Sequence, residues 1–88
     1  MEVKFKKRFF KDYEKLPVRI KDDIGKIVFD EFPNHKSFQK IQNIKKIKGY
    51  KNFYRIKCGQ YRVGFEYNEN IIVFYRVLHR KDIYKYFP

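Results

Sequence analysis

Residues 54–65, YRIKCGQYRVGF, combine cations suited to phosphate chemistry with the apolar side chains of a strand pair. Successive side chains of a strand point to opposite faces, so Arg55 and Lys57 share one face. A hairpin turn at Gly59-Gln60 brings Arg62 back beside Lys57. The segment therefore predicts three clustered cations, Arg55, Lys57 and Arg62, on one face of a sheet.

A second group of polar side chains follows the last strand-like run, where the sheet is expected to end. It consists of His79, Arg80, Lys81 and Tyr84. Strand ends and loops are common places for functional groups because a rigid scaffold holds them there. Structural roles stay open at this point: the arginines as solvated surface, Tyr84 as a cap on the core, and His79 as a hydrogen-bonding group.

The chemistry open to these side chains is narrow. One Cys and two distant His residues give no metal-ligand spacing, and the sequence has no Gly-rich phosphate loop or serine elbow. We therefore expect no metal and no cofactor. Cations, tyrosine and a histidine suit RNA phosphodiester cleavage, in which the substrate supplies its own 2′-OH nucleophile. The protein then needs only to align that hydroxyl, stabilise charge and move protons.

The net charge of +12 on 88 residues points to a polyanionic partner. Its distribution is uneven: seven of the ten acids lie at or before Glu31, while residues 36–62 hold nine basic residues and no acid. Nucleic acid is the leading partner class, followed by an acidic protein and then an anionic membrane. The alternative is that lysine is a solvated filler residue in a lysine-rich proteome.

The elements that must position these side chains follow from periodicity. Alternation predicts a strand over 1–6, and helical spacing predicts a short helix that Pro17 ends. A second helix follows and stops at Pro33-Asn34. Its predicted buried stripe consists of Ile20, Ile24, Ile27, Val28 and Phe32. Gly25 in this helix marks a close approach to a neighbouring element.

Residues 34–50 have little periodicity and are expected to form a basic connection, with one helical turn near residues 37–40. Three strands are predicted next, over 52–58, 61–67 and 70–78, joined by short turns. The third is apolar on both faces, which indicates a central strand whose Arg76 is buried and paired. A final segment, 80–86, is expected to be a turn of helix or a tail over the sheet.

This order predicts an α+β fold: an N-terminal strand, two helices on one face, then a three-stranded antiparallel meander that completes a small sheet. At 88 residues the chain is too short for two cores, so residues 1–88 are expected to form one domain. No apolar run reaches the ~20 residues of a membrane span, and no signal-peptide core is present. A lone Cys58 fits a reducing cytoplasm, the expected location.

The sequence resembles the RelE/ParE superfamily of toxins, and especially its RelE branch with the archaeal members. The resemblance is carried by VKFKKRFFKDYEKLP near the start and by the pattern KGY-x-x-x-YRI-x-x-G-x-YR followed by RVLHRKDIY. It spans Val3 to Phe87 without large gaps. It implies a microbial RNase-like fold and a metal-independent, ribosome-dependent endonuclease that cuts mRNA in the A site. It also implies a cognate RelB-like antitoxin as partner.

The resemblance further implies roles for individual residues. Lys57 matches the lysine proposed as general base, and Arg62 matches the arginine that stabilises transition-state charge. Arg80 matches the arginine that protonates or steadies the leaving group. Tyr84 matches the tyrosine that stacks on a substrate base. The expected substrate-binding residues are Arg55, Lys48, Lys51 and His79.

The general base and acid stay open among Lys57, His79 and Tyr84. ParE-like members of the superfamily inhibit DNA gyrase and have no cleavage site, so gyrase inhibition is the alternative function, together with non-catalytic binding to the ribosome or RNA. The basic residues and the tyrosine near the C-terminus favour the RelE branch.

Overall fold

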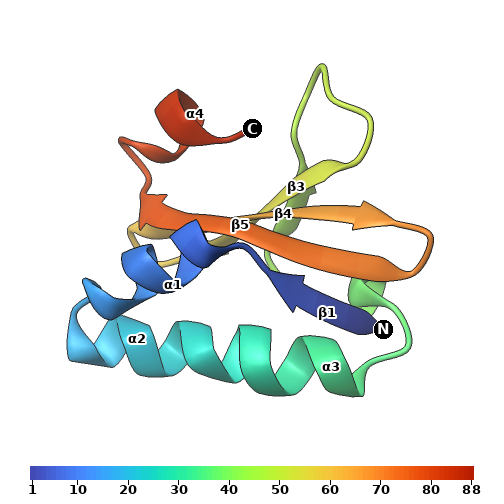
Figure 1. The fold of residues 1–88 in the computed structure, drawn as a ribbon, viewed down its shortest axis with the longest axis horizontal. Helices are drawn as coiled ribbons and strands as arrows, with labels where there is room; N and C mark the ends of the chain where they lie inside the picture. Colours follow the sequence, from blue (N-terminus) through green and yellow to red (C-terminus); the bar gives the residue numbers. More distant parts are fainter.

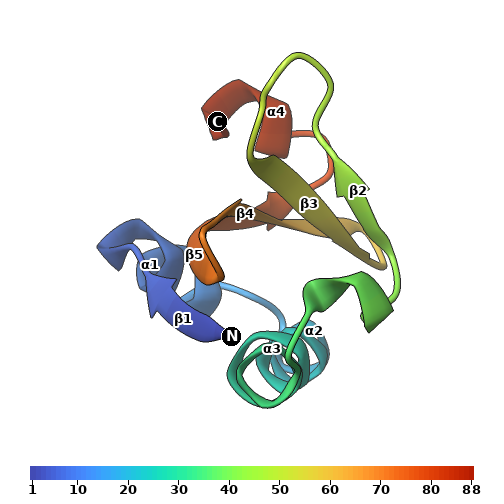
Figure 2. The same cartoon turned by 90° about the vertical axis from the view of Figure 1, so that its right-hand side faces the viewer.

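Five strands form one mixed sheet in the order β1-β5-β4-β3-β2 (Figure 1; β2 is labelled in Figure 2). The structure is a computed structural model that describes all residues from Met1 to Pro88. The strands are β1 (Glu2–Phe5), β2 (Ile44–Lys46), β3 (Phe53–Cys58), β4 (Tyr61–Asn68) and β5 (Ile71–His79). β1 runs parallel to β5, and the other neighbours are antiparallel. The predicted N-terminal strand and meander are confirmed, each end within one residue.

One strand was not expected. β2 lies inside the segment predicted as a connection, and its three residues pair with Tyr54, Arg55 and Ile56 of β3. Three residues are too few for alternation to be visible in a sequence, so pairing with β3 must form this strand. The helical turn expected just before it is confirmed as η2 (Phe38–Lys40).

The predicted helices form a layer on one face of the sheet. α1 (Lys7–Glu14) is followed by a rod in which α2 (Val18–Gly25), the π-helical η1 (Lys26–Glu31) and α3 (Phe32–Asn34) continue one another. Figure 2 shows this rod end-on beneath the sheet. A Cβ at Gly25 would lie 2.7 Å from the Tyr13 hydroxyl, which confirms the predicted close approach of α2 to a neighbour.

The main core lies between the sheet and this helical layer. Ile24, Val28 and Phe32 of the predicted stripe are buried, while Ile20 and Ile27 pack at its margin. Aromatic rings fill much of the space across to the strands, and Phe32 lies 5.1 Å from Phe74 between ring centroids. Their large apolar area compensates for the small size of the fold.

The opposite face is partly covered by α4 (Ile83–Tyr86), which lies between the β2–β3 side and the α1 side (Figure 2). It is the helical turn expected in the final segment. The expectation that the helices lie on one face therefore holds for α1 and the rod and not for α4. Ile83, Phe87 and Ile47 form a second, smaller core on this face. No helix has both the length and the apolarity that crossing a bilayer requires.

Candidate active site

The predicted cationic row is present on β3 and β4. Lys57 lies directly opposite Arg62, and Arg55 lies opposite Gly64. Residues directly opposite in antiparallel strands share a face, with Cβ atoms about 4.5–5.5 Å apart. Ile56 and Val63 of the same strands are fully buried on the helix side. The hairpin register thus separates a cationic face from an apolar one, as predicted.

β2 widens this row into a groove. Lys45 lies opposite Arg55 in the β2–β3 pairing, so the two cations share the face that α4 partly covers. The groove runs between β2–β3 and α4 and is lined by Lys45, Lys46, Ile47, Lys48, Arg55 and Tyr84. We call it the cationic groove. Its volume of about 340 Å³ is at the lower end of the range for small-molecule sites.

The hairpin turn Gly59-Gln60 holds two of the predicted arginines. Arg62 Nη1 donates to the carbonyls of Gly59 (2.9 Å) and Tyr61 (3.0 Å). Arg80 donates to Gln60 twice: its Nε to Oε1 and its backbone N–H to the carbonyl, both at 2.7 Å. Gly59 has φ +58°, a conformation that favours glycine. The turn therefore brings Arg62 and Arg80, 18 positions apart in the sequence, to one place next to Lys57.

Tyr84 lies on α4 and lines the cationic groove with Arg55 and Lys48. Its side chain is 60 % exposed, which leaves an aromatic face free to stack on a ligand. Lys51 is exposed on the loop between β2 and β3. The structure thus gathers most of the predicted site residues on one side of the sheet.

His79 does not join them. It lies opposite Tyr61 in the β4–β5 pairing, on the face that packs against the helices, with the two rings 5.5 Å apart. Its Nδ1 accepts a hydrogen bond from the backbone N–H of Lys81 at 3.1 Å. His79 lines a different groove, between α1 and α4.

Lys45 and Lys46 are site residues that the sequence reasoning missed. Both line the cationic groove, but they lie on β2, inside the residues predicted to form a connection. The available signal was weak: Ile44 and Lys45 alternate for a single step. The basic charge of residues 34–50 is visible in the sequence, whereas the place of Lys45 and Lys46 on the sheet is not.

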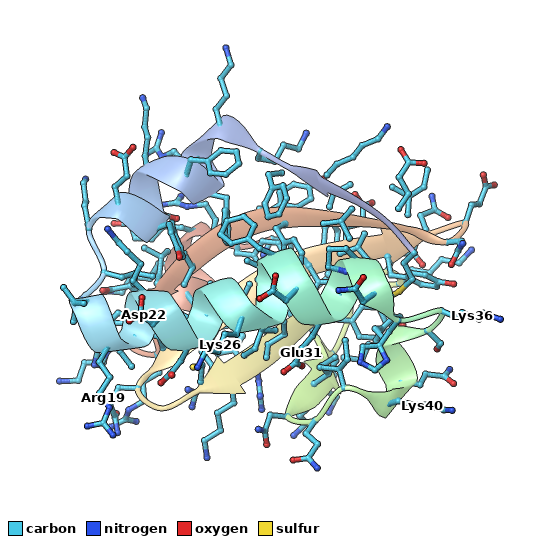
Figure 3. The ribbon with its side chains drawn as sticks, turned by 90° about the horizontal axis from the view of Figure 1, so that it is seen from below. Arg19, Asp22, Lys26, Glu31, Lys36 and Lys40 are labelled. Atoms are coloured by element: carbon cyan, nitrogen blue, oxygen red, sulfur yellow. The ribbon has the colours of Figure 1, made fainter.

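The charges of the site are not neutralised by neighbouring acids. The structure has three ion pairs, Lys4–Glu2, Arg76–Asp12 and Lys85–Asp82, and none of them involves a residue of the cationic groove. On the helix side, by contrast, acids such as Asp22 and Glu31 alternate with Arg19 and Lys26 along the rod (Figure 3). The unpaired cations therefore leave a positive potential on the α4 side of the sheet.

Tyr75 is a further polar side chain on the side of the sheet that α4 covers. The Tyr75 hydroxyl donates to Glu66 Oε1 at 2.9 Å, and burial, followed by this carboxylate, raises the pKa of Tyr75. Tyr75 is thus a fixed, protonated donor at neutral pH. No group of three or more His, Cys, Asp or Glu side chains is placed to hold a metal ion.

Comparison with known proteins identifies the family to which this chain is similar. Residues 3–84 match the family model described as the ParE toxin of the type II toxin–antitoxin system parDE. Toxin RelE3 of Methanocaldococcus jannaschii is 49 % identical over 89 residues, with all of both chains covered.

The fold is likewise shared with solved toxin structures. The RelB–RelE antitoxin–toxin complex from Methanococcus jannaschii matches with a TM-score of 0.83 and 48 % identity, covering 97 % of this chain and 99 % of that chain. The isolated E. coli RelE toxin matches with a TM-score of 0.67 and 18 % identity, covering 89 % and 82 %. At that lower identity the likeness concerns the fold alone.

Proposed function

This chain belongs to the RelE/ParE superfamily of type II toxin–antitoxin toxins, and we propose that it is a RelE-type endoribonuclease that cuts mRNA in the ribosomal A site. The observation that carries the proposal is the hairpin turn that holds Arg62 and Arg80 beside Lys57. An A-site target implies that the toxin acts in the cytoplasm. The proposed reaction uses no metal and no cofactor.

The proposed reaction is an internal transfer within the RNA. The 2′-OH oxygen attacks the adjacent phosphorus, the bond from phosphorus to the 5′ oxygen of the next nucleotide breaks, and a 2′,3′-cyclic phosphate and a 5′-OH result. One proton leaves the 2′-OH and one reaches the departing oxygen. Extra negative charge develops on the phosphoryl oxygens between these events, and preorganised cations stabilise it.

The side chains divide this work by position. Lys57, in its neutral amine form, accepts the proton of the 2′-OH, and Arg62, directly opposite it, stabilises the charge on the phosphoryl oxygens. Arg80, held on the same turn, donates to or steadies the leaving oxygen. The position of His79 on the opposite face favours Lys57 and Tyr84 over His79 as proton carriers.

Substrate binding is assigned to the cationic groove and its surroundings. Lys48 and Arg55 contact phosphates, joined by Lys45. Lys51, exposed on the loop outside the groove, extends the positive surface. Tyr84 stacks on a base, because its ring is exposed beside these cations. Cations that follow a backbone, together with a stacking aromatic ring, are the usual means of binding single-stranded RNA.

We also propose a RelB-like antitoxin as the partner of this toxin. The M. jannaschii relative at 48 % identity is a RelB–RelE complex. An acidic or amphipathic antitoxin fits the unpaired cations on the α4 side of the sheet. Such a protein is expected to co-purify when the neighbouring reading frames are expressed together. Failure of any small partner to co-purify would count against this assignment.

The direct test is to add the purified toxin to a translating ribosome extract and map mRNA ends by primer extension. Cuts within A-site codons are expected, and their absence at every position would refute the nuclease. Omitting ribosomes from a parallel reaction separates ribosome-dependent cleavage from cleavage of free RNA.

The second candidate function is inhibition without cleavage, by binding gyrase or ribosomal RNA. The match to the ParE family model supports it. Arg62→Ala and Arg80→Ala discriminate between the two. A nuclease loses cleavage by orders of magnitude and keeps its fold, whereas a binder mainly weakens, with a shallower salt dependence. A DNA supercoiling assay with purified gyrase tests inhibition of gyrase directly.

A further inference from the structure

The turn that carries Tyr84 needs support from outside itself. α4 has four residues and no side-chain cap at its start, and its backbone hydrogen bonds include those from Lys85 to Asp82 and from Phe87 to Ile83. A helix of this length has no stability of its own in water. Its position, and that of Tyr84 in the cationic groove, must therefore come from contacts with the rest of the fold.

One contact anchors the end of α4 to the sheet below it. The Phe87 ring lies against Gly64 of β4 so closely that a Cβ at Gly64 would clash with it. Phe87 is 2 % exposed, and Ile83 beside it is fully buried. The Phe87 ring also lies 5.4 Å from Phe53 and 5.5 Å from Tyr75 between ring centroids, so the smaller core holds the apolar side of α4. Tyr84 and Tyr86, on the outer side of the turn, stay 60 % and 59 % exposed.

A second contact acts on the side of α4 away from the cationic groove. The Arg76 guanidinium carbon lies 5.4 Å from the centroid of the Tyr86 ring, within the range of a cation–π interaction. Tyr84 and Tyr86 are two residues apart in one turn, so their side chains differ in direction by about 200°. Tyr86 accordingly lines the groove between α1 and α4, and Tyr84 lines the cationic groove.

Arg76 itself is held rigidly. Its Nε and Nη2 donate to the two carboxylate oxygens of Asp12 on α1, at 2.7 and 3.1 Å. Asp12 is 9 % exposed and also accepts the Val77 backbone N–H at 3.2 Å. That N–H is available because β1 pairs with β5 only as far as Phe74. The Asp12 carboxylate thus satisfies a backbone N–H at the edge of β5 and also orients the Arg76 guanidinium.

We infer that Arg76, fixed by Asp12, is a positioning residue that holds the outer side of α4 through Tyr86 and, together with the buried Ile83 and Phe87, places Tyr84 in the candidate active site. The inference rests on the proposed function for its effect on cleavage. A planar guanidinium can bind a carboxylate with two hydrogen bonds and still present its face to a ring, which a lysine cannot do. This explains why an arginine occupies the position.

The test uses Tyr86→Ala, which removes the ring, and Tyr86→Phe, which keeps it. Tyr86→Ala is expected to lower kcat for A-site cleavage about tenfold and also to raise KM, because a displaced Tyr84 neither aligns the base nor stacks on it, while the cations are untouched. Tyr86→Phe should behave as wild type. Arg76→Lys is expected to follow Tyr86→Ala, and Lys85→Ala, on the same turn, serves as the matched control.

Amide hydrogen exchange provides a readout that does not depend on cleavage. The Phe87 amide, bonded to the Ile83 carbonyl at 2.9 Å, should exchange about tenfold faster in Tyr86→Ala and at the wild-type rate in Tyr86→Phe. Unchanged exchange in Tyr86→Ala, or a kcat loss shared equally by Tyr86→Phe, would overturn the inference. If even the wild type cuts no mRNA, the proposed function fails, and the exchange rates still decide how α4 is docked.

Discussion

The two sides of α4 use basic residues in opposite ways. On one side, the cationic groove is lined by Lys45, Lys46, Lys48 and Arg55 and by no acid. On the other side, in the groove between α1 and α4, Arg76 is bound by the buried carboxylate of Asp12. Each groove also receives one tyrosine from α4.

The difference between the grooves indicates what each cation is for. A buried, paired arginine holds elements together, and losing its partner leaves an uncompensated charge. An unpaired cation on an open surface adds little to stability and remains available to a ligand. The same residue type is thus structural at Arg76, whereas Arg55 and Arg62 have no carboxylate partner and are proposed to bind and act on RNA.

The largest effect on stability is expected where the Asp12–Arg76 ion pair is broken. Asp12→Ala leaves the Arg76 guanidinium, 15 % exposed, without its partner and should lower the free energy of unfolding by about 3–5 kcal/mol. Chemical denaturation measures this loss. The exposed Asp30→Ala serves as control and should stay within about 0.5 kcal/mol of wild type. If Asp12→Ala lowered the free energy of unfolding no more than Asp30→Ala, Arg76 would not have the structural role that distinguishes its groove from the cationic groove.

For Arg62→Ala we expect the opposite result, a large loss of cleavage with a small change in stability. Cleavage on the ribosome is expected to fall about 10²–10³-fold, because a donor to the transition-state charge is lost. The free energy of unfolding should change by about 1 kcal/mol or less, since the hydrogen bonds lost are two to turn carbonyls. Primer extension and denaturation measure the two quantities. Arg19→Ala, on the exposed surface of α2, should leave both unchanged.

A smaller effect should distinguish the lysines of the two grooves. Lys45→Ala is expected to reduce the slope of log K against log salt for single-stranded RNA by about 0.7, the share of one phosphate contact. Lys15→Ala, from the groove between α1 and α4, should leave the slope unchanged. Fluorescence anisotropy over a salt series measures both. Equal slopes for the two variants would show that the grooves are equivalent toward RNA.

The smallest effect concerns the reactivity of the Cys58 thiol, on the helix side of the sheet. Cys58 follows Lys57 in β3 but points to the helix side, where burial and then Asp23 raise the pKa of its thiol. A raised pKa means less thiolate at a given pH, so alkylation near pH 8 should be slower than for an exposed cysteine. Asp23→Asn should lower the pKa and speed the reaction. Alkylation rates measured against pH check both, and a thiol faster than the exposed reference would contradict the assignment.

Local pattern was sufficient for the hairpin. The alternation in β3 and β4 and the Gly59-Gln60 turn predicted that Lys57 and Arg62 are neighbours, and the register confirms it. The apolar third strand predicted a buried and paired Arg76: the pairing is confirmed, and the side chain is mostly but not fully buried, with 15 % exposed. Its partner could not be read from the sequence, because Asp12 lies 64 positions away on a helix whose position relative to β5 is set by packing.

What the sequence determined by itself was therefore which side chains share a face, because the strand period of two and the turn residues act over neighbouring positions. What covers each face was decided only in the tertiary structure. β2 and α4 are three and four residues long, and neither has stability without long-range partners. Together they turned a row of cations into a groove with a tyrosine. His79 lies on the other side of the sheet because the β4–β5 register places it opposite Tyr61.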